Sequence, residues 1–587
     1  MGTNGQNSDK TNENLILKQL FVTYIVPHKW SMICITLIIL LGVLMGNISP
    51  FLYGKMVDAI NSMDLNKLTS LIATYCIITL VTQGFSLLEK YYGEVISFRI
   101  ENNIKNELIK KMITAKCKDY SRYTTGEYIS RLNGDSESII TFFLDLITNI
   151  GQLTINLGIS IAFILSISLK LSSVALFYLP ASFLVSFMAR KYFKKLAIKQ
   201  RHLDDRQFSF ISEVFSNHNG IKSFQMEKSI LSKYREFVAS RFILIKKSLH
   251  LGNTTEILNN MVTLASSMYV IYISAILIKN GDLTLGTMIS FNTYINIMYA
   301  SVNKIWSFNI SKQSVLIAAG RIQEIMEMDC EYNSIDGSVI SLSNMPCLEM
   351  KDIIFSYPGT SVPVLRDLNF YINSYGIYSI VGKNGCGKST LAKLIVRFYD
   401  ANKGTFSIDG KDCSEYTLES LRSNITYIQK DDFFFHDTII NNLLMANNKA
   451  TKEEVYKVCI QANIYDFIMS LPNQFDTLIG EGGSTLSSGQ KQKLSIARAL
   501  LRNTKILILD EVTANLDGSA EKDILSILLK LRHDTIIILI SHKASSIIGS
   551  DCIFVMEHGE IIASGNHAKL SKECPLYNEL FGTVIEW

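Results

Sequence analysis

Charged side chains are scarce in this sequence. Asp, Glu, Lys and Arg make up 19% of its 587 residues, whereas hydrophobic residues make up 48%. The chain is too apolar for an ordinary soluble protein and too charged to lie wholly within a membrane. Its composition also excludes disordered and collagen-like chains. We therefore expect two kinds of domain, one embedded in a membrane and one soluble.

Paired cysteines and a strong net charge are also lacking. Ten cysteines are scattered singly, with no C-x-x-C pair, which argues against a zinc ribbon and against a secreted disulfide framework. We expect them to be small apolar side chains in a reducing compartment. The formal net charge of +4 is too small to point to a nucleic-acid partner.

Long apolar segments dominate the first half of the chain. A stretch of about 20 such residues can cross a hydrocarbon core about 30 Å thick. Buried helices of a large soluble protein are the alternative, but a soluble core rarely needs so many of these runs. We expect residues 1–30 to form a polar tail and an amphipathic elbow, and residues 31–328 to form a transmembrane domain with six helices. The six predicted spans are 30–50, 68–88, 139–167, 171–188, 257–278 and 288–310.

Lys and Arg are concentrated between the second and third spans and between the fourth and fifth. The positive-inside rule places these segments in the cytoplasm, together with both termini and the second domain. We expect the membrane to be the inner (plasma) membrane of the cell. Ile100, Ile104 and Leu108 recur every fourth residue, so we expect the second span to continue as one helix below the membrane. Polar and turn-forming residues at 329–346 predict a linker.

A glycine-rich turn follows an apolar strand at 376–382 and precedes a helix. This order of strand, turn and helix is the context that a P-loop requires. Backbone N–H groups of the turn would surround the phosphates of ATP, Lys388 would reach the β and γ phosphates, and the Ser389 hydroxyl would bind Mg²⁺. The predicted nucleotide contacts of this loop are Gly382, Asn384, Gly385, Cys386, Gly387, Lys388, Ser389 and Thr390.

A second aliphatic strand ends in Asp510 and Glu511. Such a run is typical of a parallel strand buried on both faces, whose carboxyl end presents ligand-binding groups. We expect Asp510 to hold Mg²⁺ and Glu511 to accept a proton from the attacking water. A strand that merely stops at a charged turn is the alternative, and the P-loop argues against it.

Residues 485–490, Thr-Leu-Ser-Ser-Gly-Gln, resemble the LSGGQ signature of the ATP-binding cassette superfamily, with Ser488 where the first glycine of the pair is usual. The resemblance implies further roles. Tyr357 would stack on adenine, Gln429 would reach Mg²⁺ and the reacting water, and His542 would assist Glu511 in catalysis. Residues 514–517 resemble the D-loop. The signature residues implied to bind nucleotide are Ser487, Gly489 and Gln490.

With six spans before the cassette, the chain resembles an exporter half-transporter of the bacterial peptide and multidrug type, with the type IV fold. This implies an all-α six-helix transmembrane domain followed by an α/β P-loop ATPase domain at 347–587, with ATP and Mg²⁺ as cofactors. In this family each nucleotide lies between the P-loop of one subunit and the signature of another. Two chains would form the full transporter, as a homodimer in the simplest arrangement; a heterodimer stays open.

Polar side chains follow one helical face in the third span and one in the sixth. They would line a hydrated, mildly acidic substrate path, or they would make hydrogen bonds between helices. We expect membrane lipid and an exported small peptide or amphipathic molecule as partners. We expect the substrate to be a bacteriocin-like peptide, and a drug or a lipid is the alternative substrate. The alternative function is that of a nucleotide-gated channel or a regulatory membrane protein. The path residues are Asp145, Asn149, Gln152, Asn156, Asn292, Asn296 and Tyr299.

Overall fold

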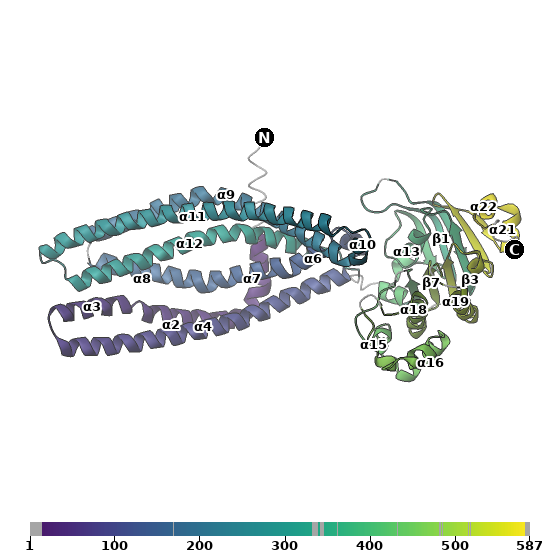
Figure 1. The fold of residues 1–587 in the computed structure, drawn as a ribbon, viewed down its shortest axis with the longest axis horizontal. Coiled ribbons are helices and arrows are strands. Elements are labelled where there is room, and N and C mark those ends of the chain that lie inside the picture. Colours follow the sequence, from purple (N-terminus) through teal and green to yellow (C-terminus); the bar gives the residue numbers. More distant parts are fainter. Residues whose placement is uncertain are drawn as a thin grey trace. The chain divides into compact units, whose positions relative to one another are not determined.

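A computed structural model gives the three-dimensional structure of the chain (Figure 1). It divides into two compact units, one of Met1–Ala115 with Tyr120–Met328 and one of Lys116–Asp119 with Asp329–Trp587. Part of the predicted linker, and Asn515 and Asp517 of the D-loop, lie outside the described residues. The described residues are 15–167, 169–331, 338–340, 346–360, 362–430, 432–480, 483, 485–514, 516 and 518–581.

The first unit consists of helices, as the sequence predicts (Figure 1). Helix α4 runs without a break over Leu65–Thr114, 50 residues, far more than the roughly 20 that a bilayer needs. The predicted continuation of the second span is therefore confirmed. The other main helices are α2 (Lys29–Gly46), α3 (Ser49–Asn61), α6 (Thr125–Ser130), α7 (Ser136–Asp145), α8 (Gly151–Ile167), α9 (Leu169–Ser216), α10 (His218–Ser223), α11 (Glu227–Lys279) and α12 (Leu285–Met326).

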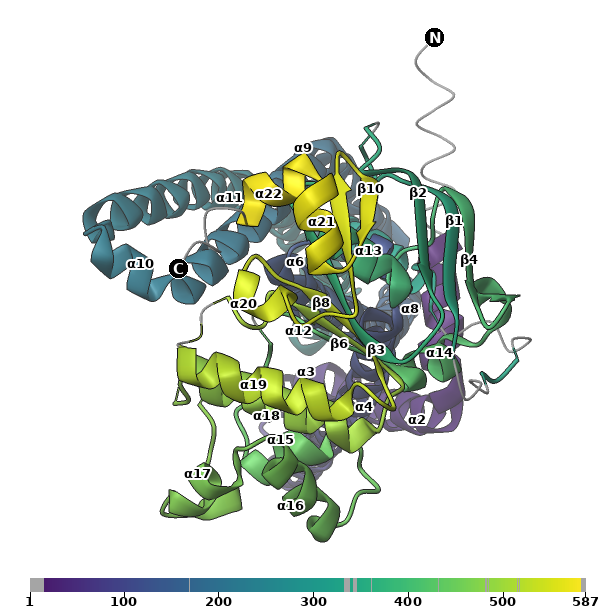
Figure 2. The ribbon, with the colours of Figure 1, turned by 90° about the vertical axis from the view of Figure 1, so that its right-hand side faces the viewer.

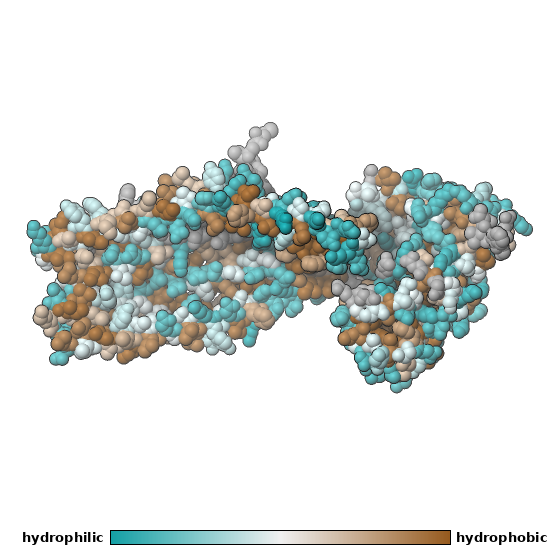
Figure 3. All heavy atoms as spheres, in the orientation of Figure 1, coloured by the Kyte–Doolittle hydropathy of each residue, from teal (hydrophilic) through white to brown (hydrophobic). Residues whose placement is uncertain are grey.

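Four helical stretches among the described residues are long and apolar enough to cross a membrane: Leu15–Asn61, Leu65–Thr114, Thr125–Ile167 and Glu227–Lys279. The other two predicted spans lie within α9 and α12, where several side chains are outside the described residues. Hydrophobic side chains cover much of the surface of this unit (Figure 3), and Leu80 and Leu87 of α4 are 73% and 69% exposed. Such a surface is suited to lipid or to another protein chain.

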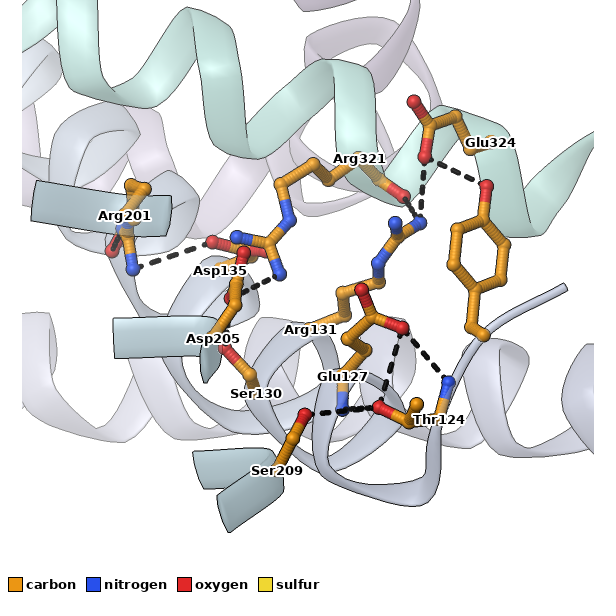
Figure 4. A network of polar contacts seen from close by, with 12 residues as sticks. Thr124, Glu127, Ser130, Arg131, Asp135, Arg201, Asp205, Ser209, Arg321 and Glu324 are labelled. Atoms are coloured by element: carbon orange, nitrogen blue, oxygen red, sulfur yellow. Dashed lines mark hydrogen bonds and ion pairs between the residues drawn. The ribbon is translucent and has the colours of Figure 1, made fainter. Parts of the chain in front are cut away.

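Buried charges join three distant segments of the helical unit (Figure 4). Asp135, in the π-turn η3 (Arg131–Asp135), is fully buried. Its carboxylate oxygens lie 3.1 Å from Arg321 Nε of α12 and 3.4 Å from Arg201 Nη1 of α9. Arg321 also reaches Asp205 of α9 at 2.9 Å. Removing one partner would leave a buried charge uncompensated, so these pairs fix how the three segments pack.

Helices α3 and α12 cross with their backbones in close contact. A Cβ atom added at Gly54 would lie 2.0 Å from Ser290 Oγ and 2.4 Å from the carbonyl oxygen of Gly286. Asp58 of α3 accepts hydrogen bonds from the Gly286 amide at 2.8 Å and from the Thr284 hydroxyl at 2.9 Å. Glycine at both positions therefore permits a backbone approach that any larger residue would block.

We predict that Gly54→Ala will destabilise the helical unit, because the added methyl group overlaps Ser290 and the Gly286 backbone. Overpacking of this kind costs about 1–3 kcal/mol, so the melting temperature of the purified protein should fall by several degrees. Gly158→Ala in α8 is the matched control, since nothing lies within 4 Å of its Cβ position. Equal melting temperatures for the two variants would contradict this packing.

The second unit is built on two sheets (Figure 2). A six-stranded sheet has the order β10-β9-β3-β8-β7-β6, in which all pairs except β10 with β9 are parallel. A four-stranded antiparallel sheet has the order β2-β1-β4-β5. The strands are β1 (Leu348–Phe355), β2 (Leu365–Ile372), β3 (Gly376–Gly382), β4 (Lys403–Ile408), β5 (Lys411–Asp412), β6 (Ile425–Ile428), β7 (Ile506–Asp510), β8 (Ile536–Ile540), β9 (Cys552–Glu557) and β10 (Glu560–Gly565).

Every residue of strands β3, β7 and β8 is buried, as expected for parallel strands covered on both faces. Their aliphatic side chains fill the two largest apolar clusters of this unit. The predicted α/β architecture is confirmed. Helices of this unit include α5 (Cys117–Tyr120), α13 (Lys388–Ile395), α14 (Leu418–Asn424), α15 (Ile439–Leu444), α16 (Lys452–Gln461), α17 (Tyr465–Ser470), α18 (Ser488–Arg502), α19 (Gly518–Leu531), α20 (Ala544–Ile547), α21 (His567–Glu573) and α22 (Pro575–Phe581).

Candidate functional site

The carboxyl ends of four adjacent parallel strands carry the predicted catalytic residues. In the order β3-β8-β7-β6, the strands lead into the P-loop, His542, the pair Asp510 and Glu511, and Gln429. Parallel strands end at the same edge of a sheet, so residues from positions 382 to 542 meet there although they are far apart in sequence.

The P-loop connects β3 to α13 and encloses the side chain of its lysine. Gly385 and Gly387 have φ angles of +81° and +109°, a conformation that favours glycine. Lys388 is 6% exposed, and its ammonium group donates to the carbonyls of Gly382 at 2.8 Å and Lys383 at 3.1 Å. Backbone N–H groups of such a loop, at the start of a helix, form an anion site for phosphates.

Asp510 ends β7, and one of its oxygens is held by a residue that sequence analysis missed. The Tyr427 hydroxyl donates to Asp510 Oδ2 at 2.8 Å. Burial and the neighbouring carboxylate raise the pKa of Tyr427, so it stays a donor. Asp510 Oδ1 is buried and has no hydrogen-bond partner among the described residues. A buried carboxylate oxygen without a hydrogen-bond partner is suited to bind a Mg²⁺ ion or a water molecule of its coordination shell.

Glu511 follows directly, with a φ of +53° that is uncommon for a side chain of this size. Its two oxygens face different partners. Lys430 Nζ lies 3.2 Å from Glu511 Oε2, and His542 Nε2 lies 3.6 Å from Glu511 Oε1. Burial and the nearby Lys388 lower the pKa of His542, although Glu511 opposes this shift, so the imidazole is neutral near pH 7.

Lys430 is the second residue that sequence analysis missed. Its side chain pairs with Glu511, and its carbonyl accepts a hydrogen bond from Gln492 of α18 at 2.9 Å. Gln429, predicted to reach Mg²⁺, is exposed beside it at the end of β6. Tyr427 and Lys430 lie within two residues of Gln429 in the sequence. Closeness to that predicted site residue is the one feature of the sequence that could have identified them.

The signature residues form the beginning of α18. Ser487 caps the helix, since its side chain accepts from the Gln490 amide at 3.3 Å and its own amide donates to Gln490 Oε1 at 2.8 Å. This reciprocal capping box fixes where the helix starts. A Cβ added at Gly489 would lie 3.3 Å from Ala520 Cβ of α19. Glycine at this position therefore lets the two helices approach closely.

Tyr357, the predicted adenine contact, follows β1. Its hydroxyl lies 3.1 Å from Thr390 Oγ1 of α13, which ties it to the P-loop helix. A cavity of about 800 Å³ opens beside it, large enough for a nucleobase and ribose. Residues lining this cavity include Lys116, Lys118, Cys330, Glu331, Tyr357, Arg397 and Tyr399.

The polar face of the third span divides into two environments. Asp145 and Asn149 hydrogen-bond to each other at 2.8 Å and line a cavity of about 520 Å³ that also contains Glu89 and Glu94 of α4. Asn156 instead accepts a hydrogen bond at 2.6 Å from Asn47, which follows α2. The π-turn η4 (Leu146–Ile150), which contains Asn149, lies between Asp145 and Asn156. Its wider turn shifts the helical register, so a constant period of 3.6 residues does not describe this span.

The polar face of the sixth span is also divided. Tyr299 is 1% exposed and hydrogen-bonds to Ser266 of α11, which is a contact between helices. Asn292 has a buried side-chain oxygen with no hydrogen-bond partner in the described part of the chain. Asn296 is exposed, and Gln152 on the third span is half-buried.

Comparison with protein families gives two matches. Residues 32–302 match the model of the ABC transporter transmembrane region, and residues 365–514 match the ABC transporter model. The first match lies within the helical unit, and the second covers the P-loop, the signature and the pair Asp510 and Glu511.

Two curated relatives and one solved structure are similar over most of the chain. The lactococcin-G-processing and transport ATP-binding protein of Lactococcus lactis subsp. lactis is 30% identical over 84% of this chain and 70% of its own. A putative multidrug export ATP-binding/permease protein of Staphylococcus aureus (strain bovine RF122 / ET3-1) is 30% identical over 86% of this chain and 87% of its own. The structure of a bacterial Atm1-family ABC exporter with ATP bound superposes with a TM-score of 0.87 at 25% identity, and the match covers 95% of this chain and 99% of that one. The chain therefore belongs to the ABC transporter family, as an exporter of the peptide and multidrug type whose ATPase activity is coupled to transport.

Proposed function

We propose that two copies of this chain form an exporter that uses ATP to move a bacteriocin-like peptide out of the cytoplasm. The observation that carries the proposal is the complete hydrolytic set at one sheet edge, with Glu511 next to Asp510 and in contact with Lys430 and His542. A regulatory protein or nucleotide-gated channel has no need of such a base. A single chain carries one P-loop and one signature, and two identical copies would complete two sites.

In the proposed reaction Lys388 and the P-loop amides hold the phosphates, and Tyr357 stacks on the adenine. Asp510, Ser389 and Gln429 would hold Mg²⁺, which neutralises phosphate charge when bound. Glu511 takes a proton from the attacking water. Lys430 and His542 direct the two oxygens of that carboxylate, and the neutral imidazole of His542 adds no positive charge beside Lys388.

The substrate proposal is supported by the cavity beside α7 and α8. Its lining includes Asp145, Asn149, Glu89 and Glu94, and among its described lining residues Lys90 is the one cation. Asp145 and Asn149 lie within the predicted third span, where polar and acidic groups are costly unless they face water or a ligand. A cationic, amphipathic peptide would compensate these charges. A peptide-transporting relative is consistent with this class, and the multidrug relative keeps a small amphipathic drug as the second candidate.

We further propose that the exporter lies in the bacterial inner membrane with both termini and the ATPase unit in the cytoplasm. The Lys- and Arg-rich stretches that flank α5 and α10 support this orientation. Coupling would pass through two segments, 116–124 and 215–222, which include α5 and α10. The amide of Lys116 donates to the Asp329 carbonyl at 2.9 Å, and Asp119 accepts from the Asp329 amide at 3.3 Å.

Transport itself is tested with inside-out vesicles that contain the purified protein and a fluorescent cationic peptide. We expect the peptide to accumulate against its gradient with ATP, and vesicles that carry Glu511→Gln should not accumulate it. Movement that stops at equal concentrations would indicate a channel. Accumulation of a neutral dye or lipid, with none of the peptide, would favour the multidrug or lipid alternative.

We predict that Glu511→Gln retains ATP binding but loses steady-state hydrolysis. The amide cannot accept the water's proton, and general-base catalysis contributes about 10²–10⁴-fold. Glu560→Gln, an exposed change in β10, is the matched control. Hydrolysis by Glu511→Gln within threefold of the wild-type rate would overturn the assignment.

Lys388→Ala should instead weaken ATP binding, because the buried ammonium group that faces the loop carbonyls is removed. A charge-assisted phosphate contact is worth several-fold to about 100-fold in affinity. Binding of a fluorescent ATP analogue measures the change, with Lys452→Ala at the start of α16 as the control. An unchanged dissociation constant would exclude the proposed role of Lys388.

Single cysteines test the path in a background without the ten native cysteines. We expect Asn149→Cys to react quickly with a membrane-impermeant maleimide applied to the cytoplasmic side, since a hydrated thiol forms thiolate. Asn156→Cys, next to Asn47, and Leu80→Cys, on the apolar surface of α4, should react slowly. If Asn149→Cys reacts no faster than these two, Asp145 and Asn149 serve to pack helices.

A further inference from the structure

Two segments that follow strands β7 and β8 carry the side chains that face each other in the ATPase site. Glu511 directly follows β7, and His542 is the second residue after β8. Their side chains approach to 3.6 Å, and the Glu511 amide donates to the Ile540 carbonyl at 2.9 Å. Both side chains lie beyond the ends of the strands, so contacts between the two segments decide how far apart they are.

Hydroxyl groups connect the two segments behind this contact. Thr513 Oγ1 lies 3.5 Å from Ser541 Oγ and 3.2 Å from Ser546 Oγ, and all three residues are buried. The Ser541 hydroxyl also accepts a hydrogen bond from the Lys543 amide at 3.1 Å. Hydrogen bonds between neutral groups are weak in net terms, and those that involve a charged group are stronger. A charged contact at the same place therefore has the larger effect on the position of the segments.

Lys543 makes this charged contact. Its ammonium group donates to the carbonyl oxygen of Leu516 at 3.0 Å and to Glu521 Oε2 at 3.0 Å. Leu516 belongs to the residues that resemble the D-loop, and Glu521 lies in α19. Lys543 directly follows His542 in the chain, so its side chain holds the backbone next to the histidine.

The carboxylate of Glu521 is itself held in place. It accepts hydrogen bonds from the hydroxyl groups of Ser545 and Ser546 as well as from Lys543. Burial alone would raise the pKa of this carboxyl, but the three hydrogen bonds outweigh burial and lower its pKa, so it is ionised near pH 7. Glu521 is 6% exposed, and moving Lys543 away would remove the cation that compensates this buried charge.

The same residues are connected to the signature helix α18. A Cβ atom added at Gly489 would lie 3.9 Å from Leu516 Cδ2, so the start of α18 packs against the residue whose carbonyl Lys543 binds. Lys493 of α18 also pairs with Asp523 of α19 at 2.7 Å. A shift of α18 would therefore reach Lys543 both through Leu516 and through α19.

We propose that Lys543 is a positioning residue for ATP hydrolysis. It holds His542 at contact distance from Glu511, and the D-loop carbonyl and α19 set that position. Because Lys543 acts through His542, its removal should lower the turnover rate and leave ATP binding unchanged. A movement of the signature helix would change this rate at the site of the same chain. The inference rests on the proposed catalytic roles of Glu511 and His542.

The test measures ATP hydrolysis by the purified full-length protein in lipid nanodiscs, and the binding of a fluorescent ATP analogue to the same samples. Lys543→Met removes the ammonium group and keeps a long side chain. Lys543→Arg keeps a cation that can donate to both partners. Lys530→Met, at an exposed position of α19, is the matched control.

Misplacing a catalytic group by about 1 Å can cost about 100-fold in rate. We expect Lys543→Met to lower kcat by roughly tenfold or more, with the dissociation constant of the ATP analogue changed by less than about threefold. Lys543→Arg should keep at least about a third of the wild-type kcat, and Lys530→Met should match the wild type.

A kcat of Lys543→Met within about threefold of the wild-type value would overturn the inference. An equal loss of turnover in Lys543→Arg would overturn it too, since the cation would then not be what matters. So would a loss of ATP binding as large as the loss of turnover, because it would show general damage to the ATPase unit.

The variant His542→Ala separates positioning from stability. If Lys543 acts through the imidazole, adding Lys543→Met to His542→Ala should lower the remaining single-turnover rate by no more than about twofold. Effects of the two changes that simply multiply would mean that Lys543 acts independently of the histidine, and would overturn the inference.

If Lys543→Met does not fold, Glu521→Gln takes its place, because the amide keeps the shape of the side chain and loses the charge that holds the lysine. Its kcat should fall several-fold with ATP binding unchanged, and an unchanged kcat would overturn the inference. Normal turnover in Glu511→Gln would instead overturn the proposed base. Loss of turnover in Glu511→Gln and His542→Ala, with normal turnover in Lys543→Met, would overturn this inference alone.

Discussion

The helical unit depends on a buried carboxylate. Asp135 is fully enclosed, and the guanidinium groups of Arg201 and Arg321 lie 3.4 Å and 3.1 Å from its oxygens. Asp135 lies in η3, Arg201 in α9 and Arg321 in α12. Helices α9 and α12 contain the fourth and sixth predicted spans. A charge in this position is strongly destabilising once a partner leaves. The network therefore ties η3, α9 and α12 together in one arrangement.

The ATPase unit applies a different constraint. Parallel strands β3, β8, β7 and β6 end at one edge of the sheet. The P-loop, His542, Asp510 and Gln429 therefore converge there although they are far apart in sequence. The carboxylate of Glu511, the proposed catalytic base, is contacted by Lys430 on one oxygen and by His542 on the other. The buried strands provide rigidity, and the residues just beyond them provide the chemistry.

Prediction from sequence worked where structure depends on local spacing. The P-loop pattern predicted the order of strand, turn and helix that places Lys388 and Ser389 at the start of α13, and the aliphatic run before Asp510 predicted a buried strand. It missed Tyr427 as the donor to Asp510, because that hydrogen bond joins two strands separated by about eighty residues of chain. In the third span, a helical period placed Asp145 and Asn156 on one face. The π-turn at Leu146–Ile150 separates them, and no residue type in that turn signals it.

The sequence by itself determined the two-part architecture and the long helices, and it predicted the phosphate- and metal-binding groups, because apolar periodicity and motif spacing are properties of neighbouring residues. Only the tertiary structure decided which polar residues face a cavity, which bond to another helix, and which charges pair. These outcomes depend on helix crossings such as the one at Gly54, where a distance of a few ångströms between distant segments selects the partner.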